Sequence, residues 1–226
     1  MQRTRVKICG VMRVEDALAA ARLGADAIGL VFHRSSFRCV TAGQAWGILR
    51  ALPPFVTPVG LFVDASAEEV RDTAGSLGLR HVQLHGGEDA DCVRKLEGLI
   101  VIKAVRVASE TFQAELAAWR EAIARYHLAN LRGLVLETPA VAPGGTGMPN
   151  DFAFVKACQD AGMMDGLPPI IAAGGLTPGN VANVIRDLRP WAVDVSSGVE
   201  SSRGIKSPEK IEAFIAAASS RAASHG

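Results

Sequence analysis

The sequence has few cysteines, no long apolar run and no excess of charge of either sign. Its four cysteines lie far apart and form no C-x-x-C pair, at Cys9, Cys39, Cys92 and Cys158. This spacing argues against a disulfide scaffold or a cysteine metal cluster and is typical of a reducing compartment. No apolar run approaches the roughly 20 residues that a membrane helix needs, and the basic N-terminus leads into no apolar signal segment. We therefore expect a cytoplasmic protein that binds no metal and does not enter a membrane.

The charge balance argues against a second group of functions. Lysine and arginine together number 24 and acidic residues 23 in the 226-residue chain, a formal net charge of +1. Such a balance disfavours a dedicated surface for nucleic acid or anionic lipid, although a local basic pocket can still form. We expect neither nucleic acid nor membrane as a partner, and we leave the assembly open between a monomer and a homodimer.

The chain does contain a regular alternation of strand and helix patterns. Short β-branched or aliphatic runs predict strands over 5–9, 27–32, 58–63, 81–85, 100–105, 133–137, 169–173 and 192–196. Helical patterns follow each run, over roughly 14–23, 42–52, 66–77, 88–97, 110–127, 151–162, 178–188 and 208–218. Residues that favour helix N-termini precede several of these patterns, at Thr41, Ser66, Asp151, Thr177 with Pro178, and Ser207 with Pro208.

This alternation predicts an α/β fold, a single (β/α)₈ TIM barrel over residues 1–226 with a frayed tail from about 219 to 226. The length alone would also suit two small domains. A doubly wound open sheet is the alternative architecture, but it usually carries G-x-G-x-x-G after its first strand. This chain has "CGVMRVED" at that point. The barrel is therefore favoured.

Polar residues follow one face of several predicted strands. In the strand over 5–9, Val6 and Ile8 share one face, while Lys7 and Cys9 share the other. Strands wrapped by helices are apolar on their outward face, so the polar set should point into the barrel. Barrel enzymes keep their active sites where the strands end at the carboxyl side. The residues expected at this mouth are Cys9, His85, Glu137 and Asp194.

Two glycine-containing loops late in the chain suit an anion. The segment "AAGGLTP" follows the seventh predicted strand, and its Gly174 and Gly175 allow backbone N–H groups to approach an anion closely. The segment "VSSGVESSRG" follows the eighth, and Ser196, Ser197 and Gly198 suit the start of a short extra helix. Barrels frequently bind phosphate between these two loops, so we expect a phosphate site there.

The residue types leave other interpretations open. Cys9 could be a buried packing cysteine, and His85 could be a hydrogen-bonded residue of the mouth that takes no part in chemistry. Lys7 could only neutralise an inward carboxylate, Arg38 could be a surface loop arginine, and Asp194 could only orient a loop.

A set of motifs resembles one family in order along nearly the whole chain, from Lys7 to about Phe214. They are "KICG", "GLVF" with "SSFRCV", "VGLFV", "VQLHGGE", "IKAVRV", "PGGTG", "AAGGLTPGNV" and "VDVSSGVE…GIKSPEKI". They resemble phosphoribosylanthranilate isomerases of tryptophan biosynthesis. The resemblance implies a (β/α)₈ barrel without a cofactor. It also implies an Amadori rearrangement, which converts an N-phosphoribosyl aminoaldose into a 1-deoxyribulose-5-phosphate aminoketose.

The resemblance also implies the roles of the site residues. Cys9 would be the general base that takes the C2′ proton, and local cations should lower its pKa for that task. Glu137 would be the general acid. The side chains that bind substrate would be Lys7, Arg38 at the anthranilate carboxylate, Gln83, His85 and Asp194. The residues that hold the phosphate would be Gly145, Gly174, Gly175, Ser197 and Gly198.

The chain departs from the family pattern at three places. Glu137 stands where the family ordinarily has aspartate, and Phe37 stands in a usual serine-proline-arginine. Met148 and Asp151-Phe152 replace a more typical lysine and Asp-Trp. These departures leave two further functions open. One is a paralogue acting on a related N-glycoside phosphate, and the other is a barrel that binds a phosphosugar without turning it over.

Overall fold

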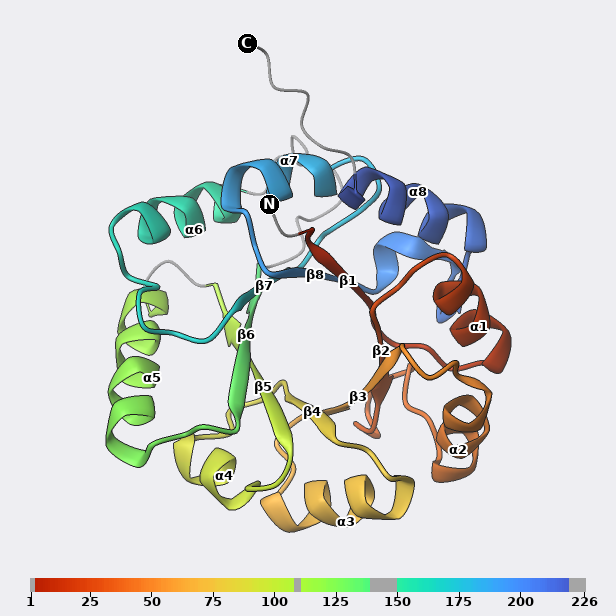
Figure 1. Cartoon of the computed structure of the whole chain (residues 1–226), viewed down its shortest axis with the longest axis horizontal. Helices are drawn as coiled ribbons and strands as arrows, with labels where there is room; N and C mark the ends of the chain where they lie inside the picture. The colour runs from red at the N-terminus through yellow and green to blue at the C-terminus, as the bar shows by residue number, and fades with distance from the viewer. Residues whose placement is uncertain (1–2, 108–110, 139–149, 220–226) are drawn as a thin grey trace.

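The computed structural model describes residues 3–107, 111–138 and 150–219, and its strands form one closed parallel barrel (Figure 1). The strands are β1 (Arg5–Ile8), β2 (Ala27–Val31), β3 (Thr57–Phe62), β4 (His81–Leu84), β5 (Ile100–Arg106), β6 (Leu131–Glu137), β7 (Ile170–Ala173) and β8 (Ala192–Val195). Each strand pairs with the next along the chain, and β8 pairs with β1 to close the ring. The predicted (β/α)₈ fold is confirmed.

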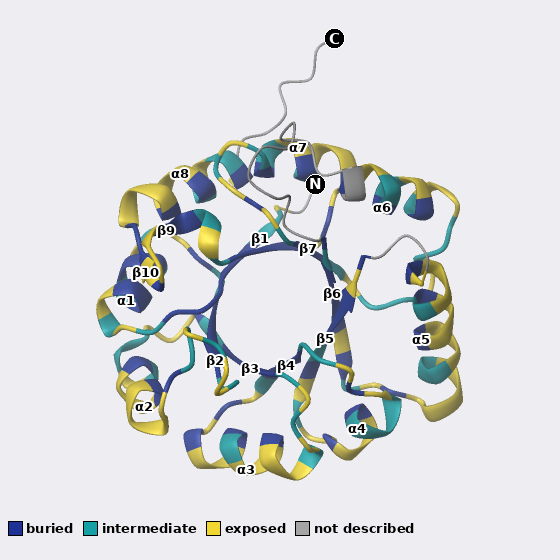
Figure 2. Ribbon diagram, turned by 180° about the vertical axis from the view of Figure 1, so that it is seen from behind, coloured by how far each residue is buried: buried dark blue, intermediate teal, exposed yellow. Residues whose placement is uncertain are grey.

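Helices form the outer layer of the molecule. They are α1 (Val14–Arg22), α2 (Ala42–Ala51), α3 (Ala67–Leu77), α4 (Ala90–Lys95), α5 (Phe112–Tyr126), α6 (Asn150–Asp160), α7 (Val181–Leu188) and α8 (Pro208–Ser219). Figure 2 shows that they turn buried residues toward the barrel and exposed residues toward the outside. No helix of the described ranges is long and apolar enough to cross a membrane.

Most of the predicted helix starts are confirmed. Thr41 and Ser66 both form capping boxes, and the Ser207 hydroxyl accepts a hydrogen bond from the Lys210 N–H at 3.2 Å. The predicted caps at Asp151 and Thr177 are wrong. Asp151 lies inside α6, which already begins at Asn150. The Thr177 carbonyl accepts from the N–H groups of Asn180 and Val181 in a turn, and α7 begins only at Val181.

The two faces of the strands carry different residues, as the alternation predicts. Val6, Ile8 and the matching apolar residues of the other strands belong to the large core between strands and helices. The opposite face holds two small apolar clusters, one around Val135 and one that contains Cys9. It also holds buried polar side chains, among them Lys7 and Asp194. The barrel therefore directs its polar side chains inward, toward the site.

The segment after β8 contains an element that the sequence analysis missed. The expected short helix is present as the 3-10 helix η1 (Ser197–Val199), but a two-stranded antiparallel hairpin follows it before α8. Its strands are β9 (Glu200–Ser202) and β10 (Ile205–Lys206). The hairpin buries Glu200 and Lys206 against the end of the barrel.

Some sequence predictions lie outside the described residues. They are the phosphate role of Gly145, the departure at Met148 and the frayed tail beyond Ser219. Within the described ranges, no group of three or more His, Cys, Asp or Glu side chains could hold a metal ion.

Candidate active site

One cavity of about 220 Å³ gathers most of the predicted site residues. Those that line it are Cys9, Arg38, His85, Glu137, Gly174, Gly175, Asp194, Ser197 and Gly198. The cavity opens where β1, β6, β7 and β8 end, which is the mouth that the alternation predicts. Lys7 and Gln83 do not line it but contact residues that do. Thr138, Leu176 and Ser196 also line the cavity. The sequence analysis assigned no role to Thr138 and Leu176, and it gave Ser196 only a place at the start of a short helix.

A buried ion pair lies beneath the cavity. The register of β1 and β8 sets Lys7 beside Asp194, and Lys7 Nζ donates to Asp194 Oδ2 at 2.6 Å. Burial opposes the charge of Lys7, but Asp194 and Cys9 together outweigh it, and the pKa of Lys7 is raised. Lys7 thus neutralises an inward carboxylate. The other oxygen of Asp194, Oδ1, is buried with no described hydrogen-bond partner, so it can accept a hydrogen bond from a bound molecule.

The Cys9 thiol follows Lys7 at the end of β1 and is only 8% exposed. Burial raises the pKa of this thiol, and the cations of Lys7 and Lys206 offset that effect only in part. The expectation that local cations lower the pKa of Cys9 below its usual value is therefore wrong for this structure. Desolvation of a thiolate exceeds the attraction of the two nearby amines.

A hydrogen-bonded chain links three of the predicted residues. Gln83 Nε2 lies 2.8 Å from His85 Nδ1, and His85 Nε2 lies 2.9 Å from Glu137 Oε2. Because the Gln83 amide nitrogen can only donate, His85 Nδ1 accepts from it, and His85 Nε2–H donates a hydrogen bond to Glu137. This hydrogen bond holds the pKa of Glu137 below its usual range, against the opposing effect of burial. Glu137 is thus a carboxylate at the end of β6 that is partnered by His85, with its side chain still 39% exposed.

The loop that follows His85 is held by a second buried ion pair. Glu88 accepts hydrogen bonds from the backbone N–H groups of Asp64 and Gly86, at 2.8 and 2.9 Å. Lys103 donates to the Gly86 carbonyl at 2.6 Å and lies 3.3 Å from Glu88. These contacts fix the backbone directly after His85, and so they support its position at the mouth.

The two loops of the expected phosphate site pack tightly together. Gly174 has φ +90°, and a Cβ there would lie 2.0 Å from the Thr138 carbonyl oxygen. A Cβ on Gly198 would lie 1.9 Å from the Leu176 carbonyl oxygen, so the loop after β7 touches η1 directly. Within the described chain, the N–H groups of Gly174 and Gly175 have no backbone acceptor. These free donors, on a wall of the cavity, suit a phosphate.

Arg38 reaches the cavity from the loop after β2 and is held by Glu200. Its Nε donates to Glu200 Oε1 at 2.7 Å and its Nη2 to Oε2 at 3.0 Å. Lys206 Nζ donates to the same carboxylate at 3.0 Å. Burial alone would raise the pKa of Glu200, but these donors outweigh it and lower the pKa to about 2. The sequence analysis gave no role to Glu200 and Lys206, although both lie in the quoted "SSGVE…GIK" motif. Charged residues are usually exposed, and these two are buried only because the hairpin folds against the barrel.

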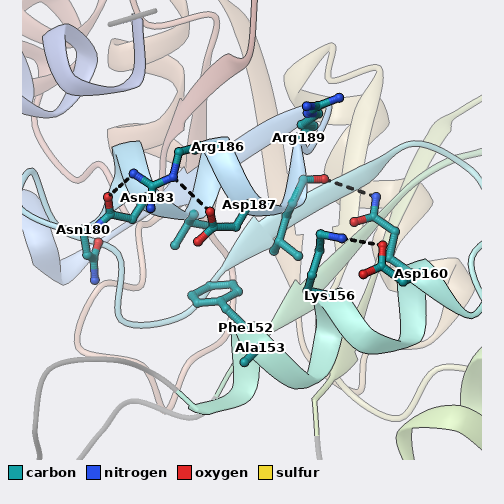
Figure 3. Close-up of a pocket in the computed structure, with 12 residues that line it drawn as sticks. Phe152, Ala153, Lys156, Asp160, Asn180, Asn183, Arg186, Asp187 and Arg189 are labelled. Carbon is teal, nitrogen blue, oxygen red and sulfur yellow. Dashed lines mark hydrogen bonds and ion pairs between the residues drawn. The ribbon is translucent and has the colours of Figure 1, made fainter. Parts of the chain in front are cut away.

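A larger hollow of about 860 Å³ lies outside the barrel, between α6 and α7 (Figure 3). Several of its polar side chains pair with one another: Lys156 with Asp160, and Arg186 with Asn183 and Asp187. No residue of the predicted site lines it. The predicted site residues therefore gather at the smaller cavity at the strand ends and not at this hollow.

Known proteins resemble this chain over almost all of its length. The profile of the N-(5'phosphoribosyl)anthranilate (PRA) isomerase family matches residues 6–217. Such an isomerase from Pseudomonas savastanoi is 46% identical over 220 residues, with 96% of this chain and 98% of the relative covered. One from Pseudomonas fluorescens is 48% identical over 223 residues, with 96% of each covered.

Solved structures agree with the sequence relatives. The phosphoribosyl anthranilate isomerase of Thermotoga maritima superposes with a TM-score of 0.82 at 38% identity, covering 95% of this chain and 98% of its own. Another, solved with reduced 1-(o-carboxyphenylamino)-1-deoxyribulose 5-phosphate, has a TM-score of 0.79 at 36% identity, with 95% and 98% covered. The family profile and these relatives together show that the chain belongs to the N-(5'-phosphoribosyl)anthranilate isomerase family.

Proposed function

We propose that this protein isomerises N-(5'-phosphoribosyl)anthranilate to 1-(2-carboxyphenylamino)-1-deoxyribulose 5-phosphate in tryptophan biosynthesis. The observation that carries the proposal is the cavity itself, in which a thiol, a carboxylate, a guanidinium and a glycine-rich wall face one space. Family membership over residues 6–217 supports it. The reaction oxidises C2′ and reduces C1′ of one molecule, so the atoms balance without an external oxidant or reductant.

The substrate has two anionic ends, and the cavity has a matching group for each. We assign the phosphate to the free N–H groups of Gly174 and Gly175 and to the start of η1, with Ser197 and Gly198. We assign the aryl carboxylate to Arg38, which lines the same cavity. The ribose then lies between the ends of β1 and β6, where the reactive side chains are.

Ring opening begins at the end of β6. The furanose oxygen needs a proton as the C1′–O bond breaks, and Glu137 is the proposed donor. The lowered pKa of Glu137 means that its carboxyl group carries a proton in only a minor fraction of the resting protein. We infer that this protonated fraction is the acid, and that His85, held by Gln83, positions the carboxyl group.

The second step takes the C2′ proton of the opened substrate. Ring opening leaves a cationic iminium at C1′, which acidifies C2′–H and attracts a thiolate. Cys9 is the proposed base, and its raised pKa means that the thiolate forms only in a minor fraction of the resting protein. The resulting enol tautomerises to the ketone as C1′ gains a proton, which completes the aminoketose.

A turnover assay tests the activity. Purified protein should convert N-(5'-phosphoribosyl)anthranilate, and the gene should restore growth to a tryptophan auxotroph that lacks this isomerase. A second candidate function is a paralogue for a related N-glycoside phosphate. Glu137 and Phe37 favour it, since both depart from the family pattern at the substrate site. A preference for another aminoaldose in the same assay would establish the paralogue.

Three further features belong to the same proposal. The chain forms one barrel domain, is located in the cytoplasm and is either a monomer or a homodimer. A similar solved structure is that of a dimeric phosphoribosylanthranilate isomerase from Thermotoga maritima, which supports testing a homodimer first. Sedimentation or light scattering gives the mass in solution, limited proteolysis tests for a second folding unit, and cell fractionation tests the location.

A further inference from the structure

We propose that Glu200 is a positioning residue for substrate binding. It holds the guanidinium of Arg38 by one edge, so that the other edge faces the aryl carboxylate of the substrate. The inference rests on the proposed function, since it requires Arg38 to bind that carboxylate. Glu200 lies on β9, outside the barrel strands, and it does not line the cavity. Its effect on the substrate must therefore pass through Arg38.

The geometry of the Arg38–Glu200 pair leaves one edge of the guanidinium free. Glu200 occupies Nε and Nη2 with its two oxygens, at 2.7 and 3.0 Å. No described residue accepts a hydrogen bond from Nη1. An arginine presents its donors in a rigid planar fork, so fixing one edge also fixes the direction of the other. Arg38 lines the cavity, and its free donors are available there to a planar carboxylate.

The faces and the stem of Arg38 are confined as well. The guanidinium carbon lies 4.2 Å from the centre of the Phe37 ring, and the guanidinium of Arg203 lies 4.0 Å from the same ring. A Cβ on Gly10 would lie 2.4 Å from Arg38 Cδ, so the stem passes directly over this glycine. Holding a long side chain in one rotamer before binding reduces the conformational entropy lost on binding. Phe37, a departure from the family pattern, thus takes part in holding Arg38.

Lys206 keeps the net charge around Arg38 and Glu200 positive, so that this cluster can attract an anion. A carboxylate beside Arg38 would by itself cancel the charge that must attract the substrate. The buried Lys206 amine lies 3.0 Å from Glu200 Oε1 and adds a second cation. Arg38, Lys206 and Glu200 together carry a net charge of plus one. Glu200 can therefore orient Arg38 while the cluster still attracts a carboxylate.

The test compares two ligands on the parent and on Glu200→Gln. One ligand is the reduced 2-carboxyphenylamino deoxyribulose phosphate, and the other is the matching phenylamino compound without the carboxylate. The parent should bind the carboxylate ligand more tightly. Glu200→Gln should weaken that ligand by about tenfold or more, because the amide cannot accept from both guanidinium nitrogens. The phenylamino ligand should lose less than about threefold, and KM should rise more than kcat falls.

Two further variants separate positioning from folding. Glu200→Asp keeps the charge beside Lys206 but withdraws it from Arg38 by about 1.5 Å, and it should give a smaller loss with the same ligand selectivity. Adding Glu200→Gln to Arg38→Ala should cause no further loss. The matched control is Asp26→Asn, which weakens a similar carboxylate–arginine fork with Arg3 near the start of β1. It should lower the melting temperature without changing either affinity.

Several outcomes would overturn the proposal. Equal losses for the two ligands in Glu200→Gln would show a general structural defect. Additive losses in the Arg38→Ala, Glu200→Gln double variant would show that Glu200 acts independently of Arg38. A parent that binds both ligands equally would remove Arg38 as the carboxylate site. A parent that binds neither ligand and does not turn over the substrate would refute the proposed function itself, and the inference with it.

Discussion

At the scale of single residues, Cys9 carries the most specific chemical prediction. Its thiol is buried beside Lys7 and has a neighbouring cavity large enough for a sugar. We expect Cys9→Ser to reduce kcat by at least about 100-fold, because a hydroxyl is far too weakly acidic to form the base. Binding of the reduced product analogue should stay within about tenfold, since serine fills nearly the same space. Steady-state kinetics and calorimetry measure the two quantities, and near-normal turnover in the variant would assign the base to another group.

The opposite pKa shifts of Cys9 and Glu137 predict an unusual pH profile. Burial raises the pKa of the thiol, and the His85 hydrogen bond lowers that of the carboxylate. Between the two values the pair of groups holds one proton, and the active arrangement is a constant fraction of that form. We therefore expect kcat/KM to be flat through neutral pH, with its limbs below the usual glutamate range and above the usual cysteine range. A slope of one across neutral pH would contradict this.

Removing the histidine donor provides a check on the acid limb. In His85→Asn the hydrogen bond to Glu137 Oε2 is lost or lengthened, so the pKa of Glu137 should rise toward its usual value. The acid limb of kcat/KM should then move to higher pH, while the alkaline limb stays in place. If the acid limb of kcat/KM stays at the same pH in the variant, that limb does not report the ionisation of Glu137.

From the resemblance of its sequence motifs, we expect the shorter aspartate at the position of Glu137. Glutamate extends the carboxyl by about 1.5 Å, and a displacement of that size can cost roughly 100-fold in rate unless the site has adjusted to it. In this structure the glutamate carboxylate lies 2.9 Å from His85 Nε2. We expect Glu137→Gln to abolish turnover.

Glu137→Asp separates the two candidate substrates. Aspartate should raise the rate on phosphoribosylanthranilate if glutamate is a poor replacement in an ordinary site. It should lower the rate on the true substrate if the site has evolved around glutamate. Activity assays of both variants on both kinds of aminoaldose distinguish these results. Full activity in Glu137→Gln would refute the acid assignment.

At the scale of elements, we expect the loop after β7 and the helix η1 to form one anion site. We expect sulfate or phosphate to occupy the space between Gly174-Gly175 and Ser197-Gly198 in crystals grown with either ion. Gly198→Ala should raise KM by about tenfold or more, because its Cβ would lie 1.9 Å from the Leu176 carbonyl oxygen and force the two loops apart. An empty position in such crystals, with the N–H groups directed elsewhere, would contradict the assignment.

Most of the strands could be predicted from the sequence, but one helix start and one hairpin could not. Alternation of apolar and polar residues predicts the strands, their inward faces and the residues at the mouth, because a strand has only two faces. The start of α7 was predicted wrongly. The Thr177 N–H donates a hydrogen bond to Asn180 Oδ1 in a turn that precedes the helix. The β9–β10 hairpin was missed, because "ESSRGIK" has no apolar alternation. Its burial of Glu200 and Lys206 depends on tertiary packing, which local pattern does not encode.

At the scale of the whole molecule, Glu200 links the site to stability in acid. Hydrogen bonds and charges from Arg38 and Lys206 lower its pKa to about 2 in the folded chain, below the usual value of an unfolded glutamate. A depressed folded pKa stabilises the fold above the unfolded pKa, and that contribution is lost as pH falls from about 5 toward about 2. Within this window the unfolded chain binds a proton at Glu200 that the folded chain does not. We therefore expect the free energy of unfolding to fall with acidification across this range.

Urea unfolding at several pH values from 7 to 2.5 measures this proton uptake. Glu200→Gln should be less stable than the parent at pH 7, and it should lose less stability on acidification. The slope of its unfolding free energy against pH should correspond to the uptake of up to one proton fewer on unfolding than in the parent. Glu121→Gln, which removes an exposed carboxylate from α5, is the matched control and should follow the slope of the parent. Because the comparison uses slopes, it does not require the variants to be equally stable at neutral pH. An unchanged slope in Glu200→Gln would mean that the carboxylate is not held in its charged form by Arg38 and Lys206.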